Sequence, residues 1–244
     1  MKDSDFKIEE NIALTDSVYR MKLLGDVSDI KAPGQFVNIR IDGFFLRRPI
    51  SVYDKDEKSF SIIYKIVGAG TKAMSEMTRG QNIYALTGLG NGYDLTLSKD
   101  KPLLIGGGVG VPPLYLLAKK LIEQGKSVTV ILGFNKKNEI FCEDEFKKLG
   151  ADVYITTVDG SYGIKGFVTD AMELDYSYIY TCGPEPMLKA VYTNMKTSGQ
   201  FSFEERMGCG FGACMGCSCK TLTGYKRICK DGPVLRKEEI LWED

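Results

Sequence analysis

The stretch KPLLIGGGVGVPP, residues 101–113, is where the chain changes from short strands to strands that alternate with helices. Its apolar half is typical of a buried strand, and its glycines precede PPLYLLAKKLIEQG, which has helical periodicity. Further along, the strand-like segments SVTVILGF, ADVYITTV and YSYIYTCG alternate with the helical segments EDEFKKLG and EPMLKAVYTNMKTSG. This alternation predicts a doubly wound parallel sheet with α/β architecture, which we assign to residues 99–200.

On either side of this unit the pattern is different. Residues 1–98 contain six short strand-like segments separated by Gly, Pro and Asp, namely FKIEENIAL, VYRMKLLG, QFVNIRI, RPISVYD, FSIIYKIV and QNIYALTGL. Six such strands predict a small antiparallel β-barrel. Residues 201–244 are rich in glycine and cysteine and form a C-terminal appendage. So few apolar side chains cannot form a core of their own, and we expect this appendage to depend on a metal for its order.

The composition of the 244-residue chain excludes several classes of function. Basic and acidic residues balance at 32 each without a polybasic run, so we expect no binding to nucleic acid. Histidine is absent, which excludes Ser-His and Cys-His catalysis, His-ligated zinc or haem, and a Rieske centre. Neither a signal peptide nor a membrane-spanning stretch is present, which predicts a cytoplasmic protein without a membrane contact.

Five of the seven cysteines crowd into the C-terminal appendage. Cys209, Cys214 and Cys217 have the spacing C-x4-C-x2-C, and Cys229 follows after eleven residues. This spacing with a distant fourth cysteine is the plant-type ligand pattern of a [2Fe–2S] cluster. Zinc is the main alternative, but a four-cysteine zinc site usually pairs two C-x2-C knuckles and here there is one. We therefore predict an iron–sulfur cluster on these four cysteines and leave Cys219 out of the ligand set.

The segment RRPISVYD, on a predicted barrel strand, is a candidate flavin site. Arg48 can donate a bidentate pair of hydrogen bonds to a pyrophosphate, Ser51 can hydrogen-bond a flavin ring, and Tyr53 can stack on that ring. The segment GAGTK follows, and its Gly-Thr step at the start of a short helix suits a diphosphate. Taken alone, RRPISVYD could equally be an ordinary edge strand with surface arginines. The predicted flavin residues, some contacting it through their backbone, are Arg48, Pro49, Ile50, Ser51, Tyr53, Ile63, Tyr64, Lys65, Gly70 and Thr71.

The glycine run after residue 105 follows a strand and opens a helix, where a nucleotide phosphate belongs. It is not a true G-x-G-x-x-G, because position 111 is valine. Its form GGGxGxxP, together with a later CGP, resembles the nicotinamide domain of the ferredoxin–NADP reductase superfamily. The segment RRPISVYD resembles the flavin-binding strand of the same superfamily. The resemblance places the CGP beside the nicotinamide ring, although Cys182 could also be a small buried apolar residue. The predicted residues are Gly107, Gly108, Gly110, Cys182, Gly183 and Pro184; no arginine is obviously placed for a 2′-phosphate, which favours NAD over NADP.

The three candidate sites form a sensible sequence of electron carriers. A nicotinamide exchanges two electrons as hydride and a [2Fe–2S] cluster exchanges one, whereas a flavin does both and belongs between them. Residues 1–98, 99–200 and 201–244 leave no part of the chain for an organic substrate. We therefore expect a partner protein that performs the substrate chemistry and meets the cluster.

Along its whole length the chain resembles the electron-transfer subunit of type B dihydroorotate dehydrogenase. The matching motifs are RRPISVYD, GAGTK, LGNGYDL, GGGVGVPPLYLLAKKL, CGPEPMLKAV and, most specifically, ERMGCGFGACMGCSCKT followed by ICKDGPVL. The resemblance implies FAD in this chain, NAD as acceptor, and an FMN-containing catalytic partner that oxidises dihydroorotate in pyrimidine (UMP) biosynthesis. It also implies a heterotetramer of two catalytic and two electron-transfer subunits. The alternatives are a flavin subunit of anaerobic sulfite reductase or of NADH-dependent ferredoxin:NADP oxidoreductase, and, in another class, a zinc-stabilised flavin-binding regulator.

Overall fold

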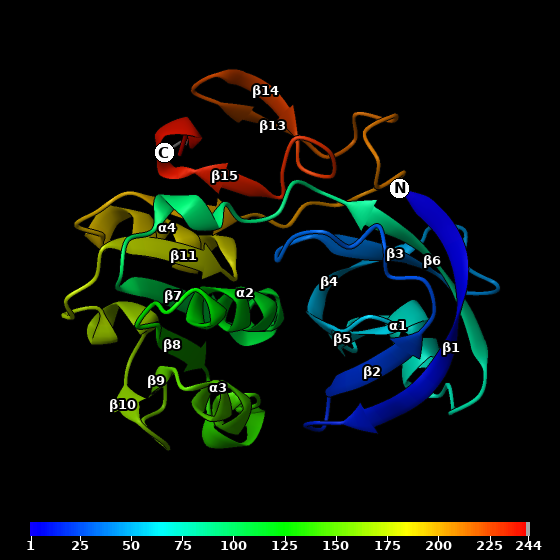
Figure 1. Ribbon diagram of the computed structural model, residues 1–244, viewed down its shortest axis with the longest axis horizontal. Coiled ribbons are helices and arrows are strands. Elements are labelled where there is room, and N and C mark those ends of the chain that lie inside the picture. The colour runs from blue at the N-terminus through cyan, green and yellow to red at the C-terminus, as the bar shows by residue number, and fades with distance from the viewer. Residues whose placement is uncertain (243–244) are drawn as a thin grey trace.

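The computed structural model describes residues 1–242. In it, the strands of the N-terminal part form a closed antiparallel barrel with the order β1-β2-β5-β4-β3-β6 (Figure 1). Alternate residues such as Val37 and Ile39 point into the barrel core, as the two-residue period of a strand requires. The predicted barrel is thereby confirmed. Its elements are β1 (Lys2–Ala13), β2 (Val18–Leu24), β3 (Phe36–Arg40), β4 (Arg48–Lys55), β5 (Ser59–Lys65), α1 (Ala69–Ser75) and β6 (Asn82–Leu89).

The second unit is a seven-stranded sheet with the order β10-β9-β8-β7-β11-β12-β15, and its strands are parallel except for β15. The central strands are apolar throughout because helices cover both faces. Within residues 1–242 no helix is long and apolar enough to cross a membrane. The elements are η1 (Leu95–Leu97), β7 (Pro102–Gly107), η2 (Gly108–Gly110), α2 (Pro112–Glu123), β8 (Thr129–Phe134), η3 (Lys137–Glu139), α3 (Glu143–Leu149), β9 (Asp152–Thr157), β10 (Ile164–Lys165), η4 (Val168–Ala171), β11 (Tyr178–Cys182), α4 (Glu185–Asn194) and β12 (Gly199–Ser202).

Helix α2 connects the sheet to the barrel. It begins with two prolines, which suit a first helical turn because their missing N–H groups would have no intrahelical partner. Its residue Tyr115 stacks on Tyr53 of β4, with ring centroids 4.4 Å apart and planes 22° apart. The Lys119 ammonium lies 2.9 Å from the Asp54 carboxylate of the same strand. Since α2 starts directly after the glycine run, these contacts place the predicted flavin strand beside the predicted nicotinamide loop.

The C-terminal segment is built into the second unit and lies across the top of the molecule in Figure 1. It contains the hairpin β13 (Ser218–Thr221) and β14 (Gly224–Arg227), then β15 (Val234–Arg236), which pairs antiparallel with β12, and η5 (Lys237–Glu239). Strand β12 itself crosses position 200, where the sequence pattern placed a boundary. Buried side chains of the segment join the core of the α/β unit, among them Cys217, Ile228, Cys229, Leu235 and Ile240. The segment therefore has an apolar anchorage that the sequence analysis did not expect.

Candidate cofactor and cluster sites

The start of β4 and the start of α1 meet at one point. An ideal Cβ on Gly70 would lie 2.4 Å from both Nε and Nη2 of Arg48, so the guanidinium rests directly on the glycine backbone. The guanidinium also lies over the Phe44 ring, 5.1 Å from its centroid, and donates to the Leu46 carbonyl. Arg48 and the start of α1, which are both predicted to bind a diphosphate, are thus adjacent in the structure although they are separated in the sequence.

Thr71 shapes the turn before α1. Its hydroxyl accepts hydrogen bonds from the backbone N–H groups of Val67 (2.9 Å) and Gly68 (3.3 Å), and donates to the Gly68 carbonyl (3.1 Å). A hydroxyl that makes these bonds has little capacity left for a ligand. The N–H groups of the first helical turn have no partner within a helix, and they are the groups that a diphosphate would meet.

The other predicted flavin residues divide between the inside and the outside of the barrel. Tyr64 points inward and donates to Asn11 Oδ1 at 2.9 Å, so a flavin could meet it only through the backbone, as predicted. Ile50 packs against the same core, whereas the half-buried Ser51 alternates with it along β4. Tyr53 is 5% exposed and has Tyr115 on one face. The structure gives Tyr53 a packing role between the two units, and its contact with a flavin stays a prediction.

The glycine run and the CGP segment are in direct contact. Strands β7 and β11 are parallel neighbours, with Cys182 opposite Gly106. An ideal Cβ on Gly110 would lie 2.3 Å from the Cys182 carbonyl oxygen and 2.5 Å from the Gly183 Cα. Since β8 lies on the other side of β7, the strand order reverses here, and ligands of doubly wound sheets bind at such a switch point.

Met187, which the sequence analysis did not single out, closes this contact from α4. Its Sδ would lie 2.5 Å from a Cβ on Gly107, and its Cε would lie 2.5 Å from a Cβ on Gly183. The only signal for it was its place in the CGPEPM motif.

Burial raises the pKa of the Cys182 thiol to about 12, against a smaller opposing effect of the Ser202 hydroxyl. Cys182 is therefore a neutral thiol at physiological pH.

The four predicted cluster cysteines form two pairs. The Cys209 sulfur accepts backbone N–H bonds from Ala213 (3.2 Å) and Cys214 (3.4 Å), and the Cys214 thiol donates to it. The Cys217 sulfur accepts the Cys229 N–H at 3.4 Å, and these two thiols also interact. Burial acts to raise the pKa of Cys209, but the N–H groups outweigh it and lower the pKa to about 6. Burial and then Cys217 raise the pKa of Cys229 to about 12, so a metal bound there must displace a proton.

This pairing suits a [2Fe–2S] cluster better than a zinc ion. Each iron of such a cluster takes two protein ligands, whereas a structural zinc draws all four onto one point. Close glycines leave room for the sulfur of Cys214, because ideal Cβ atoms on Gly208 and Gly216 would lie 3.3 and 3.5 Å from it. Cys219 lies on β13 and packs against the α/β core.

Two asparagines missed by the sequence analysis attach the cluster segment to the rest of the chain. Asn38 of β3 is 1% exposed, and its Nδ2 donates to the Cys209 carbonyl at 3.3 Å. An ideal Cβ on Gly210, whose φ is +79°, would lie 2.4 Å from that nitrogen, so only glycine fits here. Because Asn38 pairs with Pro49 of β4, the cluster loop rests beside the predicted flavin strand.

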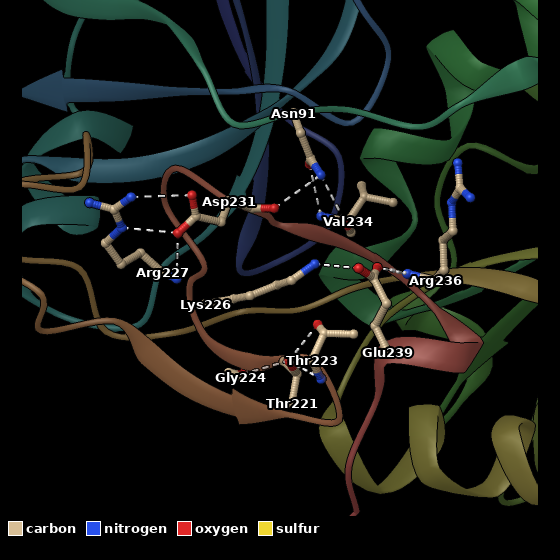
Figure 2. Close-up of polar contacts among 10 residues, drawn as sticks. All are labelled: Asn91, Thr221, Thr223, Gly224, Lys226, Arg227, Asp231, Val234, Arg236 and Glu239. Carbon is tan, nitrogen blue, oxygen red and sulfur yellow. Dashed lines mark hydrogen bonds and ion pairs between the residues drawn. The ribbon is translucent and has the colours of Figure 1, made fainter.

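Asn91, in the connection after β6, holds the end of the segment (Figure 2). Its backbone N–H donates to the Gly232 carbonyl at 2.8 Å, and its Nδ2 donates to the Val234 carbonyl at 2.7 Å and the Asp231 carbonyl at 3.3 Å. Its Oδ1 accepts the Val234 N–H at 3.1 Å. The motif LGNGYDL signalled this position but not its contacts.

A closed antiparallel barrel beside a doubly wound sheet, with a glycine loop at the switch point and a paired set of cysteines, defines an iron–sulfur reductase of the ferredoxin–NADP reductase type. Comparison with known proteins agrees with this class. Residues 204–241 match the family model "Iron-sulfur cluster binding domain of dihydroorotate dehydrogenase B", and residues 104–193 match "Oxidoreductase NAD-binding domain". The chain is 48% identical to the electron transfer subunit of dihydroorotate dehydrogenase B (NAD(+)) of Fusobacterium nucleatum, over 98% of this chain and 99% of that protein. It is 42% identical to the protein of the same name from Bacillus pumilus, over 98% of each chain.

The chain belongs to the family of dihydroorotate dehydrogenase B electron transfer subunits, and it is an oxidoreductase subunit with an iron–sulfur-binding and an NAD-binding segment. The family predicted from the motifs is thereby confirmed. Among solved structures it is similar to that of NADH-dependent reduced ferredoxin-NADP oxidoreductase, with 32% identity and a TM-score of 0.88 over 97% of this chain and 90% of that chain. A flavohemoglobin from Malassezia yamatoensis with bound FAD and heme shares the fold, with 20% identity and a TM-score of 0.66 over 80% of this chain and 56% of that chain.

Proposed function

We propose that this chain carries electrons from the FMN of a dihydroorotate-oxidising partner subunit, through a [2Fe–2S] cluster and FAD, to NAD+. The proposed context is pyrimidine (UMP) biosynthesis in the cytoplasm, in a heterotetramer of two catalytic and two electron-transfer subunits. The name shared by the relatives supports this assignment, since it describes an electron transfer subunit of an NAD(+)-dependent enzyme.

One structural observation supports this route most strongly: the three candidate sites adjoin in the order that the route needs. Asn38 attaches the Cys209 loop to the barrel wall beside β4. From the same strand, Tyr53 stacks on Tyr115 of the helix that follows the glycine run. Figure 1 shows the barrel beside the α/β unit, with the cluster segment across the top of the molecule, so the barrel strand β4 has contacts toward both the cluster loop and the helix after the glycine run.

We propose the following roles for the residues of this chain. Arg48 and the α1 N-terminus hold the diphosphate of FAD, and Ser51 orients its ring. When bound, the flavin supplies the exchange between single electrons and electron pairs. The contact between Gly110 and Cys182 forms the floor on which a nicotinamide nucleotide lies, and the neutral Cys182 thiol adds no charge there. The N–H groups that point at Cys209 offset the negative charge of the cluster ligands.

The decisive experiment uses the chain with the candidate catalytic subunit under anaerobic conditions. Dihydroorotate should bleach the flavin absorbance of this chain only when the partner is present, and NAD+ should restore it. If dihydroorotate leaves the flavin oxidised in the mixed complex while NADH reduces it, the pyrimidine assignment is wrong.

The same experiment separates the alternatives. The similarity to NADH-dependent reduced ferredoxin-NADP oxidoreductase favours, as second candidate, a subunit that exchanges electrons with ferredoxin. Reduced ferredoxin, but not dihydroorotate with its oxidising subunit, would then reduce the flavin. A zinc-stabilised flavin-binding regulator would be yellow and contain zinc, whereas the proposed protein is brown and contains two irons per chain.

A further inference from the structure

One side chain bridges the two pairs of cluster cysteines. Arg227 ends β14 and lies two residues before Cys229, so its backbone belongs to the second pair. Its Nη1 donates to the Gly212 carbonyl at 3.0 Å, within the loop between Cys209 and Cys214 of the first pair. The two loops are also packed tightly, because an ideal Cβ on Gly212 would lie 2.6 Å from Lys230 Cδ.

Asp231 fixes the direction of this arginine, as Figure 2 shows. Nε donates to Asp231 Oδ2 at 2.9 Å and Nη2 donates to Oδ1 at 3.2 Å, which is the two-pronged arrangement of a guanidinium on a carboxylate. Oδ2 also accepts the backbone N–H of Arg227 at 3.0 Å, and the Asp231 N–H donates to the Arg227 carbonyl at 2.7 Å. These bonds close the turn that presents Cys229, and Asn91 holds the far side of that turn through the Asp231 carbonyl.

The side of the guanidinium that does not face Asp231 faces the cluster loop. Nε and Nη2 donate to the Asp231 carboxylate, whereas Nη1 donates to the Gly212 carbonyl in the loop between Cys209 and Cys214. The positive end of the ion pair therefore lies against the loop of the first cysteine pair.

We propose that Arg227 is a positioning residue for the cluster: held by Asp231, it keeps the two cysteine pairs at a fixed separation and raises the reduction potential of the bound cluster. The inference rests on the proposed [2Fe–2S] site. One electron added to the cluster adds one negative charge and changes no covalent bond, and an adjacent guanidinium stabilises that form more than the oxidised one. A lysine cannot replace it fully, because an ammonium lacks the planar fork that reaches Asp231 and Gly212 together.

The test compares Arg227→Gln and Arg227→Lys with Lys226→Gln in the full-length chain carrying its cofactors. Lys226 is the matched control, since it precedes Arg227, loses the same charge on substitution, and pairs with Glu239 of η5 instead of Asp231 (Figure 2). The readouts are iron and flavin content, the EPR spectrum of the reduced cluster, and its midpoint potential in an EPR-monitored redox titration.

We expect Arg227→Gln to have a more negative midpoint potential and less bound iron than the wild type, with unchanged flavin content. Arg227→Lys should have a midpoint potential between those of Arg227→Gln and the wild type, and an altered EPR line shape. Lys226→Gln should match the wild type in every readout. If Arg227→Gln retains no iron, that loss supports the holding role and the potential is then read on Arg227→Lys.

Two results would overturn the inference. One is a wild-type potential and EPR spectrum in Arg227→Gln with full iron content. The other is an equal shift in Lys226→Gln, which would make the effect one of distant charge. A wild-type chain that binds no iron would instead refute the proposed function, so the two failures are distinguishable.

Discussion

The substitution Gly70→Ala tests whether Arg48 and the start of α1 form one diphosphate site. The new methyl group would lie 2.4 Å from Nε and Nη2 of Arg48 and 2.7 Å from its Cζ, so the guanidinium must move away. This displacement should cost the fold little, because the atoms in the way are the end of a flexible side chain. Alanine is also favoured over glycine within a helix by about 1 kcal/mol, and Gly70 lies inside α1. We therefore expect the stability of the chain to be unchanged or slightly raised.

The effect should appear in flavin binding instead. Hydrogen bonds to charged groups contribute about 1.5–3 kcal/mol, which corresponds to about a ten- to hundredfold weaker Kd for FAD if Arg48 can no longer reach the diphosphate. The measurement is a titration of the flavin-free chain with FAD, followed by the quenching of flavin fluorescence, with urea unfolding of the same samples. Gly68→Ala is the matched control in the same loop, since its φ is −179° and its ideal Cβ meets nothing within 4 Å.

A double-mutant cycle completes this test. If Gly70→Ala acts by displacing the guanidinium, it should weaken FAD binding in the wild type and have no further effect in Arg48→Ala. An unchanged Kd in both Gly70→Ala and Arg48→Ala would show that the diphosphate lies elsewhere. Additive losses would show that the two residues act on the flavin separately.

Three further predictions concern the other sites. Cys214→Ser should abolish electron flow to the partner while NADH-to-dye activity stays close to the wild type; loss of both activities together would mean that the cluster segment is needed to hold the flavin unit. Gly110→Ala should raise the KM for NADH severalfold without loss of FAD, because its Cβ would overlap the Cys182 carbonyl, and an unchanged KM would argue against a nicotinamide at the switch point. Burial raises the pKa of Cys142 from an ordinary value of 9.0 to about 12, so the folded chain keeps a proton that the unfolded chain loses, and stability should fall as the pH rises above about 9. Cys142→Ala should make that fall shallower in urea unfolding at a series of pH values, and parallel curves for the two proteins would contradict this account.

The sequence predicts most of the fold because its long elements have clear periods. The alternation that places Val37 and Ile39 in the barrel, and the apolar runs of β7 and β8, are local patterns. Strand β15 has three residues, too few to show a period, and its pairing with β12 is visible only in three dimensions. The same limit explains why spacing predicted the four cluster cysteines but not the residues that hold them. Asn38 is the one buried polar residue of β3, and its partner lies 171 residues away.

Tyr53 illustrates the limit of a motif in another way. Its place after Ser51 in RRPISVYD predicts a contact between its ring and a flavin, and the structure adds a contact that the motif does not show, the stacking of that ring on Tyr115. A motif gives residue types at a spacing, but it does not say which residue of the α/β unit stacks on the Tyr53 ring. The meeting of the glycine run with the CGP segment is easier to predict, because Gly106 and Cys182 end neighbouring parallel strands and must lie at one edge of the sheet, while the contact of this edge with a nicotinamide stays a prediction.

The way the cluster segment is attached bears on how electrons leave the chain. A cluster on a flexible tether could swing between a flavin and a partner, but β15 belongs to the sheet, and the buried Cys217 and Cys229 belong to the core beneath it. Asn38 and Asn91 add bonds to the barrel wall and to the connection between the two units. A segment held on three sides has a fixed distance to the predicted flavin strand, so in the proposed route the partner comes to the cluster. Since Cys214 is exposed whereas Cys217 and Cys229 are 2% exposed, we expect the partner's electrons to enter on the side of the first cysteine pair.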